Sequence, residues 1–459
     1  MLTYDAAINV NFLGENMGCK ISETLTLSDD KIKELNKCFA TSAFNAANGS
    51  RYIACVGENG NYGLDTIFYG FAETVQSLIT DIEEGKNCAD PLVYPILYCV
   101  RHSIELFLKM SYEMIFEIKG IKLNKSTFKK TGDISMEIDK LKNSKRNPFY
   151  TKTDEEHTLV EQENRRIDEE ISKLTSQYES CWNKILSNKK IQMTHNLKSV
   201  HNDIIAIYDV DERIQNEYDF IVKYLADYLE RDPNGDMYRY LVNDHNKKHF
   251  VSNGIQTVDL FKIDKQFIWL KALFEDFLKN VSNIYSEYST LTYTSKLSRK
   301  QLEDISHLIP KPVNFNAMIA SFKTQIMSKY QLSKSDFDRA LKIIREHNEF
   351  SWNMGKELLC QEIRTEVLEL IKECARGEKE WEDAYRFLSK DEFYSVLAFK
   401  ELGRYSNLYY SEDYNMIVRD FHNRQLNEYA LKPSVDLKYV ICGMKKCGQH
   451  TYADILAMQ

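Results

Sequence analysis

Tyr94–Tyr112 reads YPILYCVRHSIELFLKMSY, and this stretch decides the fold of the 459-residue chain. Apolar residues lie on almost every side of the helix that it predicts, so this helix should be buried. Arg101, Glu105 and Lys109 are spaced four residues apart and therefore share one face. His102 lies roughly 100° away from that face. Because an unpaired buried charge costs several kcal/mol, we expect these groups to pair with one another or to line a cleft.

The rest of the sequence predicts a mainly α-helical protein. With 7 prolines and 17 glycines, the chain is poor in turn-forming residues. We expect no membrane span, because no apolar run of about 18 residues occurs. We expect no secretory signal, because Met1 is followed by a polar stretch without a basic region and an apolar one after it. The ten cysteines are scattered, which favours the reducing cytoplasm as the location. Apolar periodicity predicts helices at Leu64–Ile82, Asp90–Ile118, Arg213–Glu230, Phe267–Tyr288, Phe315–Met327, Ser335–His347, Gly355–Cys374 and Asp391–Leu402.

A strand and a loop are predicted before the first helix. The strand is Arg51–Val56, and the loop contains Gly57, Gly60 and Gly63. Such glycines fit either a phosphate-binding loop or a structural turn. The spacing differs from that of a P-loop and no Lys-Ser/Thr pair follows, which favours the turn.

Residues 119–190 are predicted to be an insertion in the first helical domain. Lys119–Arg146 contains nine basic residues and three acidic ones. Lys125, Lys129 and Lys130 are candidates for binding RNA or an acidic partner, and the alternative is a solvated helix face. Farther along, apolar residues alternate spacings of four and three, which predicts a heptad seam in a projecting helical hairpin. The seam consists of Ile171, Leu174, Tyr178, Cys181 and Ile185.

A boundary between two helical domains is predicted near the middle of the chain. A polar run extends through Lys300, and Pro310–Pro312 then interrupts the helical pattern. We expect the first domain to span residues 1–290 and a second, α-helical C-terminal domain to span residues 313–459.

Metal binding is not expected. Cys442, Cys447 and His450 come closest to metal-ligand spacing, but a fourth ligand and a CxxC pair are missing. We therefore predict no metal and no cofactor. The formal net charge of −8 argues against a protein that coats long nucleic acid, although it leaves room for a small nucleic-acid site.

Three short segments carry a family resemblance. They are Tyr94-Pro95, the Arg101–Lys109 run described above, and Thr194–Leu197, which reads THNL. Together they resemble the HEPN-type helical domains of bacterial toxin and antiphage defence proteins, over about residues 50–250. The resemblance implies an up-down helical bundle that is often dimeric, and that in many members is a metal-independent endoribonuclease.

The resemblance also implies a type of catalytic pair. In such ribonucleases, an arginine and a histidine separated by four to six residues act on the 2′-hydroxyl and the scissile phosphate of RNA. Histidine carries protons near neutral pH and arginine is a fixed cation, so the chemistry needs no metal. Arg239 and His245 have this spacing, whereas Arg101 and His102 are adjacent. Arg239 and His245 are therefore one candidate pair.

A second candidate site brings His195 to the charged face of the Tyr94–Tyr112 helix. There His195 is the acid–base group, and Arg101 or Lys109 is the phosphate clamp. Glu105 orients one of them, with His102 close by. The alternative is a buried salt-bridge network that holds the helices in register, with His195 as a capping or packed side chain.

Two functions are consistent with these residues. The first is a metal-independent endoribonuclease, a toxin or antiphage effector that acts on RNA as a homodimer or larger homo-oligomer. Residues 313–459, or a regulatory protein partner, would then control it. The second is a non-catalytic interaction or oligomerisation protein that binds a nucleotide or a protein partner in a defence complex. Both require residues 90–118, 195–230 and 265–288 to pack as one bundle, because their apolar faces are too wide to leave in water.

Overall fold

The computed structural model describes residues 63–150, 153–189, 194–240, 247–309, 315–406, 409–424 and 436–457, with Val242 and six isolated positions before residue 63. The chain separates into two compact units, residues 1–62 and residues 63–459. Nearly all of the described residues belong to the second unit. The predicted strand at Arg51–Val56 and the glycine-rich turn after it lie almost wholly outside the described residues.

The described part of the chain is all-α, as the sequence predicts. It contains no strand, and an isolated bridge pairs Val242 with Lys248. None of its helices combines the length and the apolarity that crossing a bilayer requires. The first group of helices is α2 (Leu64–Glu83), α3 (Ala89–Leu123), α4 (Lys125–Ser144), η2 (Pro148–Tyr150), α5 (Asp154–Ile185), α6 (Leu197–Ile205), η3 (Tyr208–Val210), α7 (Glu212–Ile221), η4 (Val222–Tyr224), α8 (Ala226–Arg231), α9 (His249–Ser252) and α10 (Leu260–Ser289). The second group is α11 (Arg299–Leu308), α12 (Phe315–Lys329), α13 (Lys334–Glu346), α14 (Asn348–Asn353), α15 (Thr365–Ala375), α16 (Trp381–Phe387), α17 (Lys390–Arg404), α18 (Tyr410–Arg424), α19 (Leu437–Lys446) and α20 (His450–Ala457).

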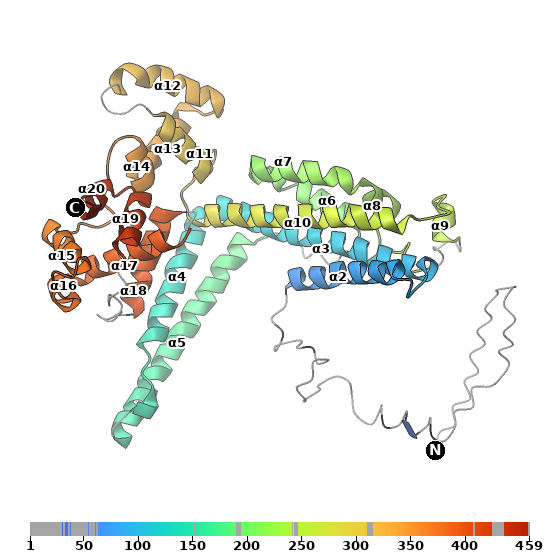
Figure 1. Ribbon diagram of the computed structural model, residues 1–459, viewed down its shortest axis with the longest axis horizontal. Coiled ribbons are helices and arrows are strands. Elements are labelled where there is room, and N and C mark those ends of the chain that lie inside the picture. The colour runs from blue at the N-terminus through green and yellow to red at the C-terminus, as the bar shows by residue number, and fades with distance from the viewer. Residues whose placement is uncertain are drawn as a thin grey trace. The chain divides into compact units, whose positions relative to one another are not determined.

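Helix α3 is the centre of the first core. It packs against α2, α6 and α10, and Figure 1 shows α2, α3 and α10 running alongside one another. Apolar side chains of these helices form one continuous core. Within it, the rings of Phe107 and Phe274 stack with their centroids 3.8 Å apart. The predicted packing of residues 90–118, 195–230 and 265–288 as one bundle is therefore confirmed.

The prediction of one continuous helix at Arg213–Glu230 is wrong. The chain instead forms α7, a tight 3-10 turn at Val222–Tyr224, and α8. Ile221 and Leu225 flank this turn and both are fully buried. Neither proline nor glycine marks the break, so the sequence carries no local signal for it. Helix α8 ends at Arg231, directly before the turn at residues 232–235.

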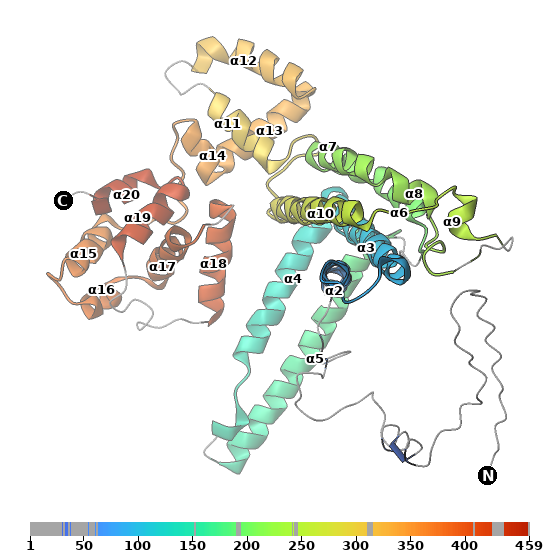
Figure 2. The ribbon, with the colours of Figure 1, turned by 45° about the vertical axis from the view of Figure 1, so that its right-hand side comes forward.

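Helices α4 and α5 pack against each other as a long two-helix hairpin, seen in Figure 2. The side chain of Thr153 caps the start of α5 by accepting from the backbone N–H of Glu156. The five predicted heptad positions on α5 are partly or fully buried, which confirms the seam. The same spacing continues toward the start of α5 through Ile167, Asn164 and Val160.

Two further cores lie in the second group of helices. Apolar residues of α11, α12, α13 and α14 form one, and those of α15 to α20 form the other. Helices α17 and α19 approach very closely at Gly403 and Gly443. A Cβ atom on Gly403 would lie 1.7 Å from the carbonyl oxygen of Tyr439, so only glycine fits there.

One expectation for this region needs correction, and one stays untested. The helix predicted at Gly355–Cys374 begins only at Thr365, because Gly355 has a φ of +82° and ends the preceding helical turn. The polar run predicted to be a boundary contains α11, which begins with a capping box between Ser298 and Gln301. The division into domains at residues 1–290 and 313–459 stays a prediction.

Candidate functional site

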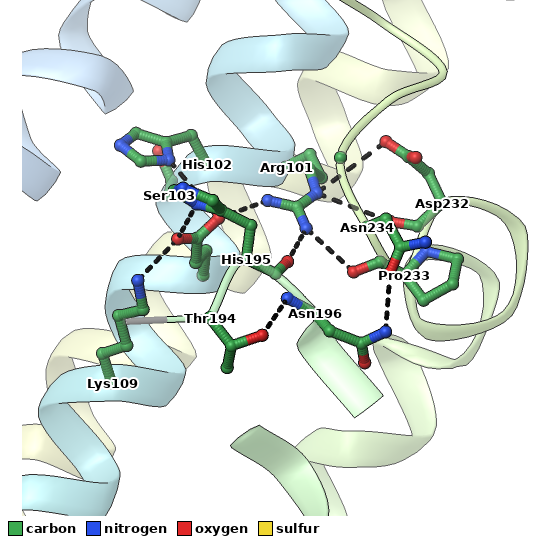
Figure 3. A network of polar contacts seen from close by, with 12 residues as sticks. Arg101, His102, Ser103, Lys109, Thr194, His195, Asn196, Asp232, Pro233 and Asn234 are labelled. Atoms are coloured by element: carbon green, nitrogen blue, oxygen red, sulfur yellow. Dashed lines mark hydrogen bonds and ion pairs between the residues drawn. The ribbon is translucent and has the colours of Figure 1, made fainter. Parts of the chain in front are cut away.

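The charged face of α3 is buried, and its charges are paired. Arg101 is 2% exposed and Glu105 is 1% exposed. As Figure 3 shows, Arg101 donates to the carbonyl oxygens of His195 and of Pro233, the latter at 3.0 Å. It also donates to the Glu105 carboxylate and, at 3.4 Å, to the carbonyl oxygen of Asp232. The guanidinium thus ties α3 to the segment before α6 and to the turn after α8.

The turn at residues 232–235, Asp-Pro-Asn-Gly, wraps around this guanidinium. Oδ1 of Asp232 accepts the backbone N–H of Asp236 at 2.9 Å, which fixes the turn. Oδ2 of Asp232 lies 3.8 Å from Nε of Arg101 and has no hydrogen-bond partner. Gly235 has a φ of +80°, and a Cβ atom there would lie 2.8 Å from Cζ of Arg101. Glycine is therefore required both by the backbone and by the contact.

Glu105 joins the remaining charged groups. Its Oε1 accepts from Nζ of Lys109 at 2.7 Å and from Nδ1 of His195 at 2.9 Å. Its Oε2 accepts from Arg101, and Nδ1 of His102 lies 3.7 Å away. Burial by itself raises the pKa of Glu105, but the contacts with His102 and Lys109 and the charges of Lys109 and Arg101 outweigh it. They hold this pKa well below its usual value, so Glu105 is a carboxylate at neutral pH.

His195 is the exposed member of the network. Its side chain is 59% exposed, although its Nδ1 is bound to the buried Glu105. Asn196, not His195, caps α6 by accepting from the backbone N–H of Ser199 at 2.9 Å. Thr194 Oγ1 accepts from the backbone N–H of Asn196 at 3.0 Å and so fixes the segment. The Nδ1 contact selects the tautomer with a proton on Nδ1, which leaves Nε2 for a substrate.

His102 is a packed side chain. Its ring stacks on Tyr98 with centroids 5.8 Å apart and meets the edge of Phe71 at 4.4 Å. Its Nδ1 lies on one side of the Glu105 carboxylate. The four residues predicted from sequence as the second candidate site, Arg101, Glu105, Lys109 and His195, therefore do lie together, with His102 beside them.

The other predicted pair, Arg239 and His245, is only half described. Arg239 donates through Nε to the carbonyl oxygen of Gly235 at 2.6 Å and lies over the ring of Tyr240. These contacts stabilise the turn. His245 lies outside the described residues.

The three lysines predicted to bind RNA or an acidic partner differ from one another. Nζ of Lys125 donates to the carbonyl oxygen of Tyr293 at 2.8 Å and lies over its ring. Burial lowers the pKa of Lys125, which marks it as an internal contact. Lys129 and Lys130 are exposed on α4. Only these two are placed to meet a partner.

Arg299 is the centre of a second buried network. Its guanidinium donates to Glu412 at 2.9 Å and to Glu349 at 3.1 Å, and Nε2 of His347 lies 3.2 Å from Glu412. In the described part of the chain, one group of side chains brings its ligand atoms close enough together for a metal ion. It consists of His347, Glu349 and Glu412. Arg299 already donates to both carboxylates, so the guanidinium occupies the position that a cation would need.

The cluster weighed as a metal site in the sequence is packed apart. Sγ of Cys447 donates to the carbonyl oxygen of Tyr410 at 3.6 Å. The ring of His450 stacks on Trp352 at 3.9 Å. Both side chains serve the packing of the last helices.

Two features of the sites were missed from the sequence. The Asp-Pro-Asn-Gly sequence of residues 232–235 indicates a turn, but its contact with Arg101 was not predicted. A buried arginine has five N–H donors, and a single carboxylate cannot accept them all. The sequence therefore indicated that Arg101 needs further acceptors. Arg299 lies in a polar run, and nothing in its neighbourhood indicates that it is buried.

Comparisons with protein-family models, with curated proteins and with solved structures found no match to this chain.

Proposed function

We propose that the chain is a HEPN-like, metal-independent endoribonuclease of a toxin or antiphage defence system, with His195 as its acid–base group. One observation carries the proposal: an exposed imidazole is held through Nδ1, at 2.9 Å, by a carboxylate that is itself buried. A carboxylate in this position fixes the tautomer and orientation of the ring and stabilises the imidazolium that forms during proton transfer.

The proposed reaction uses the 2′-hydroxyl of RNA as the nucleophile. Nε2 of His195 takes the proton of this hydroxyl, and the 2′-oxygen bonds to the phosphorus. The bond between phosphorus and the 5′-oxygen breaks, and the imidazolium returns its proton to that oxygen through a water molecule. The products are a 2′,3′-cyclic phosphate and a 5′-hydroxyl, and no oxidant or metal takes part.

Lys109 and Arg101 have different roles in this proposal. Lys109 is bound to the same carboxylate oxygen as His195, and we assign its ammonium to binding the scissile phosphate. Arg101 is enclosed by acceptors, and we assign it to positioning. Its donation to the His195 carbonyl holds the catalytic histidine against α3.

RNA is the proposed partner, and we assign the exposed Lys129 and Lys130 of α4 to binding its backbone. Charge reversal at both positions should weaken RNA binding and flatten its salt dependence, while Lys129→Gln should have a smaller effect. The homodimer, the control by residues 313–459 and the action in the cytoplasm belong to the same proposal.

Expression in bacteria tests this function. Wild-type protein should arrest growth and degrade RNA, and His195→Ala should abolish both at equal protein level. His422→Ala is the matched control, because His422 also pairs with a carboxylate, Asp391 at 3.2 Å, on an unrelated surface. Equal toxicity of the wild type and His195→Ala would contradict the assignment of His195 as the acid–base group.

A non-catalytic function is favoured by one observation. Phe149 and Tyr150, at the end of the α4–α5 hairpin, are 91% and 84% exposed. Exposed aromatic pairs of this kind are typical of protein interfaces. An interaction protein that oligomerises through this tip would leave RNA intact, and the Phe149→Ser/Tyr150→Ser variant would lower its mass in sedimentation equilibrium.

A further inference from the structure

A cavity of about 670 Å³ lies among α3, α8, α9 and the start of α10. Leu97, Tyr228, Tyr238, Phe250 and Ile263 contribute to its walls. Cavities of roughly 300–1,000 Å³ are typical binding sites for small molecules. A narrower cavity of about 380 Å³ shares Phe250 with it and is lined on its other side by Tyr94.

The cavity has an aromatic wall. The rings of Tyr238 and Phe250 have centroids 6.2 Å apart and are tilted by 49°. Phe250 in turn meets the edge of Tyr94 at 5.5 Å. Each ring is thus held by its neighbour, so the wall is preformed. Aromatic walls of this type bind planar heterocycles by stacking.

The rest of the lining offers directional polar groups. Asn253, Gln256 and Gln266 line the cavity, and each has a side-chain amide with a donor and an acceptor side. Nδ2 of Asn253 is held at 2.9 Å by the carbonyl oxygen of His249. Adjacent donors and acceptors of amides match the hydrogen-bonding edge of a nucleobase.

The mouth of the cavity carries one cation. Arg231, at the end of α8, lines the cavity beside Asp227, with Nε 3.6 Å from the carboxylate. Both side chains are exposed, so water weakens this pair and the guanidinium fork stays accessible. A guanidinium in this position suits a phosphate group, which it binds through two parallel hydrogen bonds.

We infer that this cavity is a binding site for a 5′-mononucleotide. The base lies against Phe250 and Tyr238, the amides of Gln256 and Gln266 contact its edge, and Arg231 holds the phosphate. The aromatic wall matches the base, the amides match the polar edge of the base, and Arg231 matches the phosphate. The inference is independent of the ribonuclease proposal, because none of its residues belongs to the Glu105–His195 pair.

Isothermal titration calorimetry on the full chain tests the inference. The probes are AMP, GMP, CMP and UMP, each with its nucleoside, and ribose 5-phosphate. At least one mononucleotide should saturate a single site per chain. Phe250→Ala should weaken its binding by about tenfold or more, from the usual effect of removing one stacking ring. Arg231→Gln should weaken the binding of the nucleotide and leave the affinity for the nucleoside unchanged.

Matched variants separate loss of the site from loss of the fold. Phe261→Ala removes an exposed phenylalanine of α10 that does not line the cavity, and should bind normally. Gln256→Ala changes an exposed side chain and should still weaken binding. Absence of binding for every probe at millimolar concentration would overturn the inference. So would normal affinity in both Phe250→Ala and Gln256→Ala, or loss of binding in His195→Ala alone.

Discussion

Two buried networks of this protein are each centred on an arginine, and they differ in the exposure of their histidine. Arg101 and Arg299 are 2% and 3% exposed, and each binds glutamate carboxylate and has a histidine beside it. In the Arg101 network, the side chain of His195 is 59% exposed, whereas the side chain of His347 in the Arg299 network is 9% exposed. The exposure of the histidine thus distinguishes the two networks, and the proposed function assigns the chemistry to the exposed one.

The surroundings of the second network explain why it is closed. Arg299 lies between the rings of Phe350 and Tyr409, whose centroids are 5.0 and 4.9 Å from its Cζ. Its two carboxylates come from α14 and α18, so it joins the two cores of the second group of helices. His347 caps α14 by accepting from the backbone N–H of Phe350. The charged groups of this network thus all have structural contacts.

The largest expected effect on stability is that of removing either arginine. Arg299→Ala and Arg101→Ala should each lower the free energy of unfolding by about 3–5 kcal/mol, because a buried carboxylate loses its partner. Arg146→Ala, which breaks an exposed pair with Glu156, is the control and should cost about 0–1 kcal/mol. Urea unfolding followed by circular dichroism measures all three. A loss below 1 kcal/mol for Arg299→Ala would show that this network does not support the fold.

The two histidines should differ in the same experiment. His347→Ala removes a helix cap, a contact with Glu412 and a stack on Phe350 at 3.9 Å, and should cost about 1–3 kcal/mol. His195→Ala should cost under about 1 kcal/mol, since the side chain is largely in water. Equal losses for the two variants would remove the distinction on which the comparison rests.

The bundle and the charged face of α3 could be predicted because both depend on local spacing. Arg101, Glu105 and Lys109 are neighbours on one helix whatever surrounds it, and the apolar pattern requires that helix to be buried. Contacts between distant segments carry no such signal. Arg299 meets Glu349 and Glu412, which are 50 and 113 residues away along the chain. Such partners are set by how the helices pack.

The break between α7 and α8 illustrates the same limit at the first site. It depends on a tight turn at Val222–Tyr224 that no proline or glycine announces. The two helices lead to the turn at residues 232–235, which supplies carbonyl oxygens to Arg101. The acceptors of a buried arginine thus follow from tertiary structure.

A third histidine, His201, should have a smaller effect, on the pH dependence of stability. Burial lowers the pKa of His201 below its usual 6.5, opposed by the charge of Asp219, and its Nδ1 lies 2.9 Å from the hydroxyl of Tyr218. Below pH 6.5 the unfolded chain therefore binds a proton more readily than the folded chain, and stability falls as the pH drops. Above pH 6.5 the contribution is constant. The difference in unfolding midpoint between pH 7.5 and pH 5.5 should shrink in His201→Gln, and an unchanged difference would contradict this assignment.

The most direct test of the central claim is the initial rate of RNA cleavage by purified, folded protein in the presence of EDTA. The claim is that an exposed histidine held by a buried carboxylate performs the chemistry. Wild-type protein and His422→Ala should cleave at the same rate and leave 2′,3′-cyclic phosphate ends. His195→Ala should be slower by about a hundredfold or more, the usual contribution of a general acid–base group. An unchanged rate in His195→Ala, or no cleavage by the wild-type protein, would contradict the claim.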